Sequence, residues 1–219
     1  MLAERMNTFS GSPTSALIAK VAELRAEGKD IISLNVGEPD FGTPDYIKCG
    51  AIKAIVDNFS KYTAGNGIIE LRRLISKKLH EDNNLEYTTD EICATVGAKQ
   101  AIFNSIMALV DPGDEVLLPV PCWVSYTEMI KFAGAKPVFV DVEAETFDLD
   151  IEALEKAVTT KTKAIVICTP NNPTGAVYSK ETLEKLCQIA RENHIYILAD
   201  EIYNQLDYEN QYVSIASFE

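Results

Sequence analysis

Three polar side chains follow two apolar segments in the C-terminal third of the sequence. Asn172 lies in the turn after the apolar run 164–168, and Asp200 and Tyr203 come directly after the run 195–199. An amphipathic helical segment separates the two runs, which predicts a strand, a helix and a second, parallel strand. Ligands of parallel α/β sheets bind just beyond the carboxyl ends of the strands. We therefore expect the three side chains to converge on one crevice.

These side chains suit a flat, basic heteroaromatic ligand. The Asp200 carboxylate would keep a ring nitrogen protonated, while Asn172 and Tyr203 would hold a ring oxygen. Pyridoxal 5′-phosphate has these requirements, because its ring withdraws electrons best when its pyridine nitrogen is protonated beside a carboxylate. The segment 172–175 and Asp200, each taken alone, also have a purely structural explanation. The Asn-Pro-Thr-Gly sequence at 172–175 is a common turn, and an aspartate after a strand is often a helix N-cap.

A glycine turn at residues 96–100, Val-Gly-Ala-Lys-Gln, is a candidate phosphate site. We expect a strand before it and a helix after it, so that N–H groups near Ala98 and Lys99 lie at the positive end of the helix dipole. The sequence contains neither Gly-x-Gly-x-x-Gly nor a phosphate-loop string, which argues against an unrelated nucleotide-binding protein. Trp123, the only tryptophan, follows another expected strand. Its ring would either stack on a cofactor ring or pack in the core.

The elements expected to position these residues alternate along the chain. Helices are expected over 15–28, 44–59, 68–80, 98–109, 151–159 and within 176–194, with a further helix beginning at 121–126. Strands are expected over 31–36, 91–96, 116–120, 136–142, 164–168 and 195–199. This alternation predicts an α/β fold of three αβα layers, with a mostly parallel sheet covered on both faces.

Composition narrows the class of protein. The 219 residues are 47% hydrophobic and 24% charged, as in ordinary globular proteins. The net charge of −13 argues against nucleic acid or an anionic membrane surface as a partner. The five cysteines form no Cys-x-x-Cys pair, which predicts reduced thiols and a cytoplasmic protein. With only two histidines, no metal site is expected.

Several segments resemble those of the class I pyridoxal-phosphate aminotransferases, the aspartate aminotransferase family of fold type I. Asn172-Pro173-Thr174-Gly175 and Ala199-Asp200-Glu201-Ile202-Tyr203 look like its signature segments. Gly37-Glu38-Pro39-Asp40, Tyr62-Thr63-Ala64 and the turn at 96–100 are similar to three further segments. The resemblance covers essentially the whole chain, but a little over half of a typical family member. The expected fold is therefore incomplete.

The resemblance implies a role for each matching residue. The cofactor-binding residues would be Ala98, Lys99, Trp123, Asn172, Asp200 and Tyr203, together with Tyr62, which would reach the cofactor phosphate of a neighbouring subunit. The substrate-binding residues would be Gly37, Lys99, Trp123 and Asn172, with the Gly37 N–H on the α-carboxylate. The Lys99 side chain would bind either the cofactor phosphate or a second substrate carboxylate. The shared site implies a homodimer.

The resemblance also implies that the Schiff-base lysine lies outside this chain, because no lysine follows Lys185. We therefore expect no catalytic residue within the chain and expect the chain alone to be inactive. Residues 1–40 would contribute to a small domain, and residues 41–219 would form the truncated cofactor-binding large domain.

The expected function is that of an aminotransferase, of which this chain is a part. It would pass an amino group between an amino acid, dicarboxylic such as aspartate, and a 2-oxo acid. Two alternatives stay open. A pyridoxal-phosphate C–S lyase or an aromatic aminotransferase would share every motif above, and a truncated, non-catalytic binding module would keep the fold without the lysine.

Overall fold

The structure is a computed structural model that describes residues 2–3, 6–7, 10–11 and 13–218. The chain divides into two compact units. One consists of Met1–Ser10 and Asn66–Glu219, and the other is Gly11–Gly65. The larger unit contains the sheet, and the smaller one contains helices α1 (Pro13–Ala26) and α2 (Asp45–Val56). The domain assignment 1–40 and 41–219 stays a prediction.

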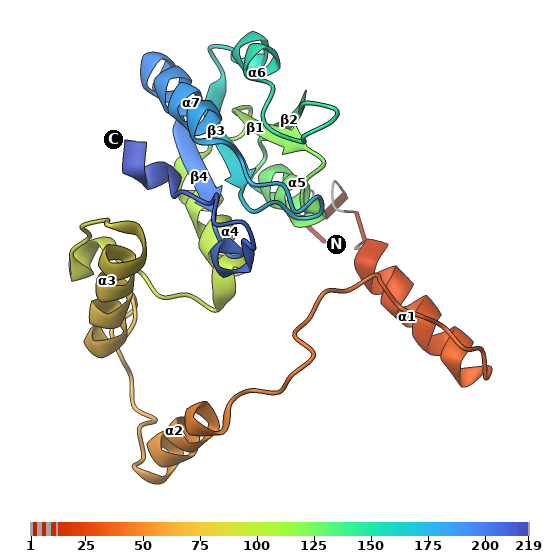
Figure 1. Cartoon of the computed structure of the whole chain (residues 1–219), viewed down its shortest axis with the longest axis vertical. Coiled ribbons are helices and arrows are strands. Elements are labelled where there is room, and N and C mark those ends of the chain that lie inside the picture. The colour runs from red at the N-terminus through yellow and green to blue at the C-terminus, as the bar shows by residue number, and fades with distance from the viewer. Residues whose placement is uncertain (1, 4–5, 8–9, 12, 219) are drawn as a thin grey trace. The chain divides into compact units, whose positions relative to one another are not determined.

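The larger unit is built on a parallel four-stranded sheet (Figure 1). Its strands are β1 (Glu115–Val120), β2 (Lys136–Asp141), β3 (Thr162–Cys168) and β4 (Tyr196–Asp200), in the spatial order β2-β1-β3-β4. The chain passes from β1 outward to β2 and then returns to the other side of β1 to form β3. The carboxyl ends of β1 and β3 therefore flank a topological switch point, where ligands of such sheets bind.

Helices cover both faces of this sheet. Residues of α4 (Gly97–Leu109) and α5 (Val124–Phe132) share a core cluster with Val116, Val166 and Cys168. Residues of α6 (Ile151–Ala157) and α7 (Lys180–Asn193) share a second cluster with Ile165 and Ile167. Because successive side chains of a strand point to opposite faces, the two clusters lie on opposite sides of the sheet. The expected three-layer α/β fold is confirmed.

Local sequence explains the bounds of these helices. Helix α7 buries Leu183 and Leu186 one turn apart, on the face that packs on the sheet. The Ser179 hydroxyl caps its first turn by accepting a hydrogen bond from the Thr182 N–H at 3.2 Å. The helix ends at His194, which adopts the left-handed conformation with φ 55°.

The remaining elements are short or lie before α4. They are α3 (Ile69–Asn83) and the 3₁₀ helices η2 (Thr89–Glu91), η3 (Asn204–Leu206) and η4 (Ile215–Phe218). The buried Arg72 guanidinium ties α3 to its flanking turns by donating to the Gly67 carbonyl at 3.2 Å and to the Thr89 carbonyl at 2.7 Å.

Two of the six expected strands are wrong. Residues 31–36 and 91–96 form no β-ladder with any described residue. Their apolar runs have a β-like pattern, but a strand also needs a partner for its backbone groups. Ile32 and Leu34 are 86% and 91% exposed. In the second segment the Ala94 N–H donates instead to the Asn66 carbonyl at 3.0 Å.

Candidate active site

Asp200 is the last residue of β4, and both oxygens of its buried carboxylate accept hydrogen bonds. Its side chain is at the carboxyl edge of the sheet, and the residue is 8% exposed. Oδ2 accepts a hydrogen bond from the Tyr126 hydroxyl at 2.7 Å, and Oδ1 accepts one from the Ile202 N–H at 3.2 Å. A buried carboxylate must be hydrogen-bonded to be tolerated, and these two donors satisfy that need. The bonds also fix the orientation of the carboxylate.

Asn172 and Tyr203 lie beside each other, as the sequence predicted. The Asn172 side-chain amide donates to the Tyr203 hydroxyl at 3.4 Å. The turn that holds Asn172 is bonded internally, because the Asn171 side-chain oxygen accepts from the Thr174 N–H at 3.2 Å and from the Thr174 hydroxyl at 3.1 Å. Asn171 is thus a structural residue of the turn, and the Asn172 side chain is left to face Tyr203.

Trp123 and Lys99 form a second pair at the same edge of the sheet. The Lys99 ammonium lies 4.8 Å from the centre of the Trp123 ring, within range of a cation–π interaction. Trp123 immediately precedes α5 and packs against the core cluster that contains Tyr126 and Cys168. Tyr203 packs against this cluster as well. Trp123 and Tyr203 therefore pack against one core cluster, with Lys99 and Asn172 as their respective partners.

The first turn of α4 offers N–H groups without a side-chain cap. The residue before the helix, Val96, makes no capping hydrogen bond, and Gly97 adopts φ 77°, a conformation that glycine accepts without strain. The Gln100 side chain accepts from the Val96 N–H at 2.7 Å, one residue before the helix begins. An uncapped helix N-terminus can bind an anion such as phosphate. This geometry suits the role expected for Ala98 and Lys99.

Gly37 and Tyr62 belong to the smaller unit, so the structure does not test their roles at this site. Both are exposed, and nothing lies within 4 Å of the position where a Cβ would be on Gly37. Their assignments stay predictions.

Tyr126 was missed by the sequence analysis. It follows Trp123 by three residues, so it lies on the same side of α5, and its ring meets the Trp123 ring edge-on at 5.3 Å and 87°. A tyrosine on the apolar face of a helix looks like an ordinary core residue. The only sequence signal was its spacing from Trp123, which places both residues at the carboxyl end of β1.

Burial governs the ionisation of the groups around Asp200. It raises the pKa of the Tyr126 hydroxyl, and the nearby Cys168 and Asp200 add to that effect. Burial, with a smaller contribution from Cys168, raises the pKa of the Cys122 thiol to about 11. The pKa of the Cys168 thiol is also raised by burial. At neutral pH these groups are therefore protonated, and neither thiol is a nucleophile.

Comparison with known proteins agrees with this geometry. The sequence model of a family described as "Aminotransferase class I and II" matches residues 29–219. The chain belongs to this aminotransferase family. It is 47% identical to the "Probable aspartate/prephenate aminotransferase" of Aquifex aeolicus, over 99% of this chain and 56% of the relative. It is 46% identical to the "Aspartate/prephenate aminotransferase" of Thermus thermophilus, over 97% of this chain and 56% of the relative.

Solved aminotransferase structures have the same fold. The structure titled "Aspartate aminotransferase from Thermus thermophilus with maleate" superposes with a TM-score of 0.96 at 44% identity, covering 100% of this chain and 57% of that one. An alanine aminotransferase from Pyrococcus furiosus gives a TM-score of 0.95 at 35% identity, covering 100% of this chain and 56% of that one. This aminotransferase chain thus spans about 56% of the length of the curated relatives above. The family's enzymes depend on pyridoxal phosphate.

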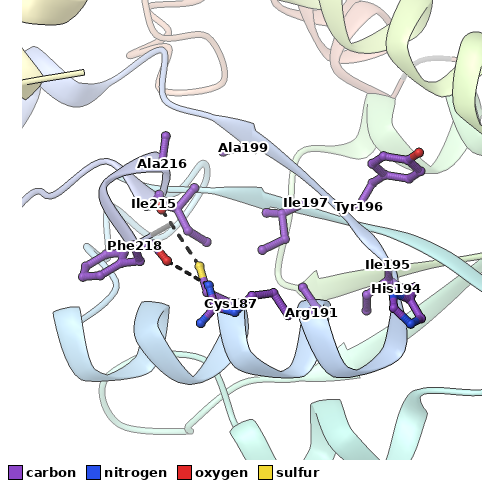
Figure 2. Close-up of a pocket in the computed structure, with 11 residues that line it drawn as sticks. Cys187, Arg191, His194, Ile195, Tyr196, Ile197, Ala199, Ile215, Ala216 and Phe218 are labelled. Atoms are coloured by element: carbon purple, nitrogen blue, oxygen red, sulfur yellow. Dashed lines mark hydrogen bonds between the residues drawn. The ribbon is translucent and has the colours of Figure 1, made fainter. Parts of the chain in front are cut away.

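A pocket of about 640 Å³ lies away from these residues, beside β4 (Figure 2). It is lined by residues of α7, β4 and η4 and by neighbouring positions, among them Cys187, Arg191, His194, Tyr196, Ile197, Ile215 and Phe218. The Arg191 guanidinium donates to the Phe218 carbonyl at 2.9 Å, which fastens η4 to α7. None of the predicted cofactor-binding residues of the aminotransferase chain lines this pocket.

Two further properties concern only the described part of the chain. No helix there is both long and apolar enough to cross a membrane. No group of three or more histidine, cysteine, aspartate or glutamate side chains there is placed to hold a metal ion.

Proposed function

We propose that this chain is the N-terminal part of a pyridoxal-phosphate aminotransferase that exchanges an amino group between an amino acid and a 2-oxo acid. The observation that carries the proposal is the buried Asp200 carboxylate at the end of β4, beside the Asn172–Tyr203 pair. This arrangement occurs in a chain that belongs to the aminotransferase family over residues 29–219.

The residues of the larger unit fit pyridoxal phosphate. When bound, the cofactor supplies a protonated pyridine ring that accepts electrons from the substrate carbon. Asp200 would hold the proton on the pyridine nitrogen, and Asn172 and Tyr203 would hold the ring oxygen. Trp123 would pack against the ring. The N–H groups of Ala98 and Lys99 would bind the phosphate at the positive end of α4.

A dicarboxylic amino acid such as aspartate is the substrate we propose. The Lys99 ammonium lies at the Trp123 ring, where it is available to a second carboxylate. Relatives that are 43–47% identical carry the names aspartate or aspartate/prephenate aminotransferase, which supports this choice. The P. furiosus structure, titled an alanine aminotransferase, has the same fold, so fold alone does not select the substrate.

The remaining parts of the enzyme are proposed from the family. The lysine that carries the cofactor would lie after residue 219, and this chain alone would be inactive. Gly37 would bind the substrate α-carboxylate through its N–H. Tyr62, which is fully exposed, would reach the cofactor phosphate of a second subunit, so the active enzyme would be a homodimer. A cytoplasmic location agrees with its five free cysteines.

The test is an amino-transfer assay of the protein at its natural length, with pyridoxal phosphate present. Aspartate with 2-oxoglutarate should give oxaloacetate and glutamate. Faster turnover of cystathionine would favour the C–S lyase alternative, and faster turnover of phenylalanine would favour an aromatic aminotransferase. Cofactor binding without any turnover would favour the non-catalytic binding module.

A further inference from the structure

Tyr126 contacts two groups that the proposed function places around the cofactor ring. Its hydroxyl donates to Asp200 Oδ2 at 2.7 Å, and its ring meets the Trp123 ring edge-on at 5.3 Å. One side chain on α5 thus touches both the carboxylate proposed for the pyridine nitrogen and the indole proposed for the ring face.

Burial gives the Tyr126 hydroxyl a fixed position. The residue is 1% exposed and belongs to the core cluster that also contains Ile130 and Cys168. A buried tyrosine has few rotatable bonds and is held by close packing, so its hydroxyl cannot move aside without disturbing the core. Burial also raises the pKa of this hydroxyl, so the hydroxyl is protonated at neutral pH and can donate.

The Asp200 carboxylate needs such a donor to keep one orientation. Its second donor, the Ile202 N–H, comes from the chain directly after Asp200 and is longer, at 3.2 Å. A bond to the adjacent backbone moves together with the residue that it restrains. Tyr126 instead approaches from another helix, 74 residues away in the sequence, and so fixes the carboxylate relative to the rest of the fold.

We propose that Tyr126 is a positioning residue. Its hydroxyl orients the Asp200 carboxylate toward the pyridine nitrogen, and its ring holds the Trp123 ring in place beside that carboxylate. This inference rests on the proposed function. The hydroxyl itself touches no cofactor atom in this account. Its effect passes through Asp200, and this distinguishes it from a catalytic residue.

The test compares the wild-type protein at its natural length with Tyr126→Phe, using pyridoxamine 5′-phosphate as the probe. The probe binds without a covalent bond to lysine. Two quantities are measured: its Kd, and the proton NMR resonance of its pyridinium N–H. Tyr126→Phe should raise Kd by about three- to tenfold, in the range of one lost hydrogen bond. The N–H resonance should move upfield, because a carboxylate that rotates freely makes a longer bond.

Three further variants separate positioning from packing. Tyr178→Phe removes another buried tyrosine hydroxyl, on the opposite face of the sheet and beside Asn171 rather than Asp200, and should leave the resonance unchanged. Replacing Tyr126 with 3-fluorotyrosine keeps the ring and the hydroxyl and should restore the wild-type values, even if Tyr126→Phe folds poorly. On an Asp200→Asn background, Tyr126→Phe should have no additional effect on Kd.

An unchanged N–H resonance in Tyr126→Phe would overturn the inference. So would a Kd effect that persists in full on the Asp200→Asn background. Failure of the wild-type protein to bind pyridoxamine 5′-phosphate is a different result, because it would overturn the proposed function and this inference together.

Discussion

Asp200 is the residue on which the proposed chemistry depends most. A carboxylate beside the pyridine nitrogen stabilises charge that develops during the reaction, whereas the phosphate site supplies much of the cofactor's binding. We therefore predict that Asp200→Ala lowers kcat by about a hundred- to a thousandfold and raises the Kd for pyridoxal phosphate far less. Steady-state kinetics and an absorbance titration measure the two effects. Normal turnover of the variant would show that the assignment of Asp200 is wrong.

The Lys99 ammonium has two candidate ligands, the second carboxylate of the substrate and the cofactor phosphate. If its ammonium binds the second carboxylate of the substrate, Lys99→Met should raise the KM for aspartate by about ten- to a hundredfold, the value of one charge-assisted hydrogen bond. The KM for phenylalanine should stay unchanged. If the ammonium binds the cofactor phosphate instead, the variant should raise the Kd for pyridoxal phosphate and impair both substrates equally. We expect the first pattern.

The cysteines give a test that needs no cofactor. Cys49 and Cys93 are exposed, whereas burial raises the pKa of Cys122 to about 11 and also raises that of Cys168. Only thiolates react readily with iodoacetamide. At pH 8 the folded protein should be alkylated at Cys49 and Cys93 within minutes and at Cys122 and Cys168 only after denaturation. Peptide mass spectrometry identifies the modified sites, and rapid labelling of Cys168 in the native protein would contradict the packing described here.

At the scale of elements, the sequence predicted the four paired strands and the helices around them. The bounds of β3 and β4 were predicted within about two residues, because their apolar runs are strong local signals, and α7 lies inside the predicted range 176–194. Residues 91–96 were predicted wrongly, because strand pairing depends on a partner that local sequence does not specify. Tyr126 was missed for a related reason: its bond to Asp200 joins residues 74 positions apart.

The cap of α6 supplies a stability test at this scale. Asp150 accepts a hydrogen bond from the Ala153 N–H at 2.9 Å, and Asp150→Ala should lower the free energy of unfolding by about 1 kcal/mol. Glu152→Ala is the matched control in the same helix. Its carboxylate is 83% exposed and pairs with Lys156 at 3.3 Å, so its loss should change stability by less than about 0.5 kcal/mol. Denaturant unfolding of both variants measures the difference, and equal effects would contradict the capping role.

At the scale of the whole molecule, the chain exposes surfaces that folded proteins normally cover. Among the described residues, β4 pairs with β3 alone, so its other edge has no partner strand. Helix α2 in the smaller unit buries none of its residues, although Ile52, Ile55 and Val56 are apolar. Open strand edges and apolar patches of this kind promote association.

We therefore predict that the 219-residue chain, produced alone, is a dimer or aggregates at micromolar concentration. Sedimentation velocity measures its association, and thermal unfolding at several protein concentrations tests whether stability depends on association. A monomer with a sharp, reversible and concentration-independent unfolding transition would contradict this prediction.

The central claim is that these residues form the cofactor-binding part of a complete aminotransferase. Its most direct test is the intact mass of the protein from its native source, reduced with borohydride in the presence of pyridoxal phosphate. The account predicts a mass well above the 24.2 kDa of this chain, with one phosphopyridoxyl group on a lysine after residue 219. A mass of 24.2 kDa without an adduct would contradict it and leave the non-catalytic binding module.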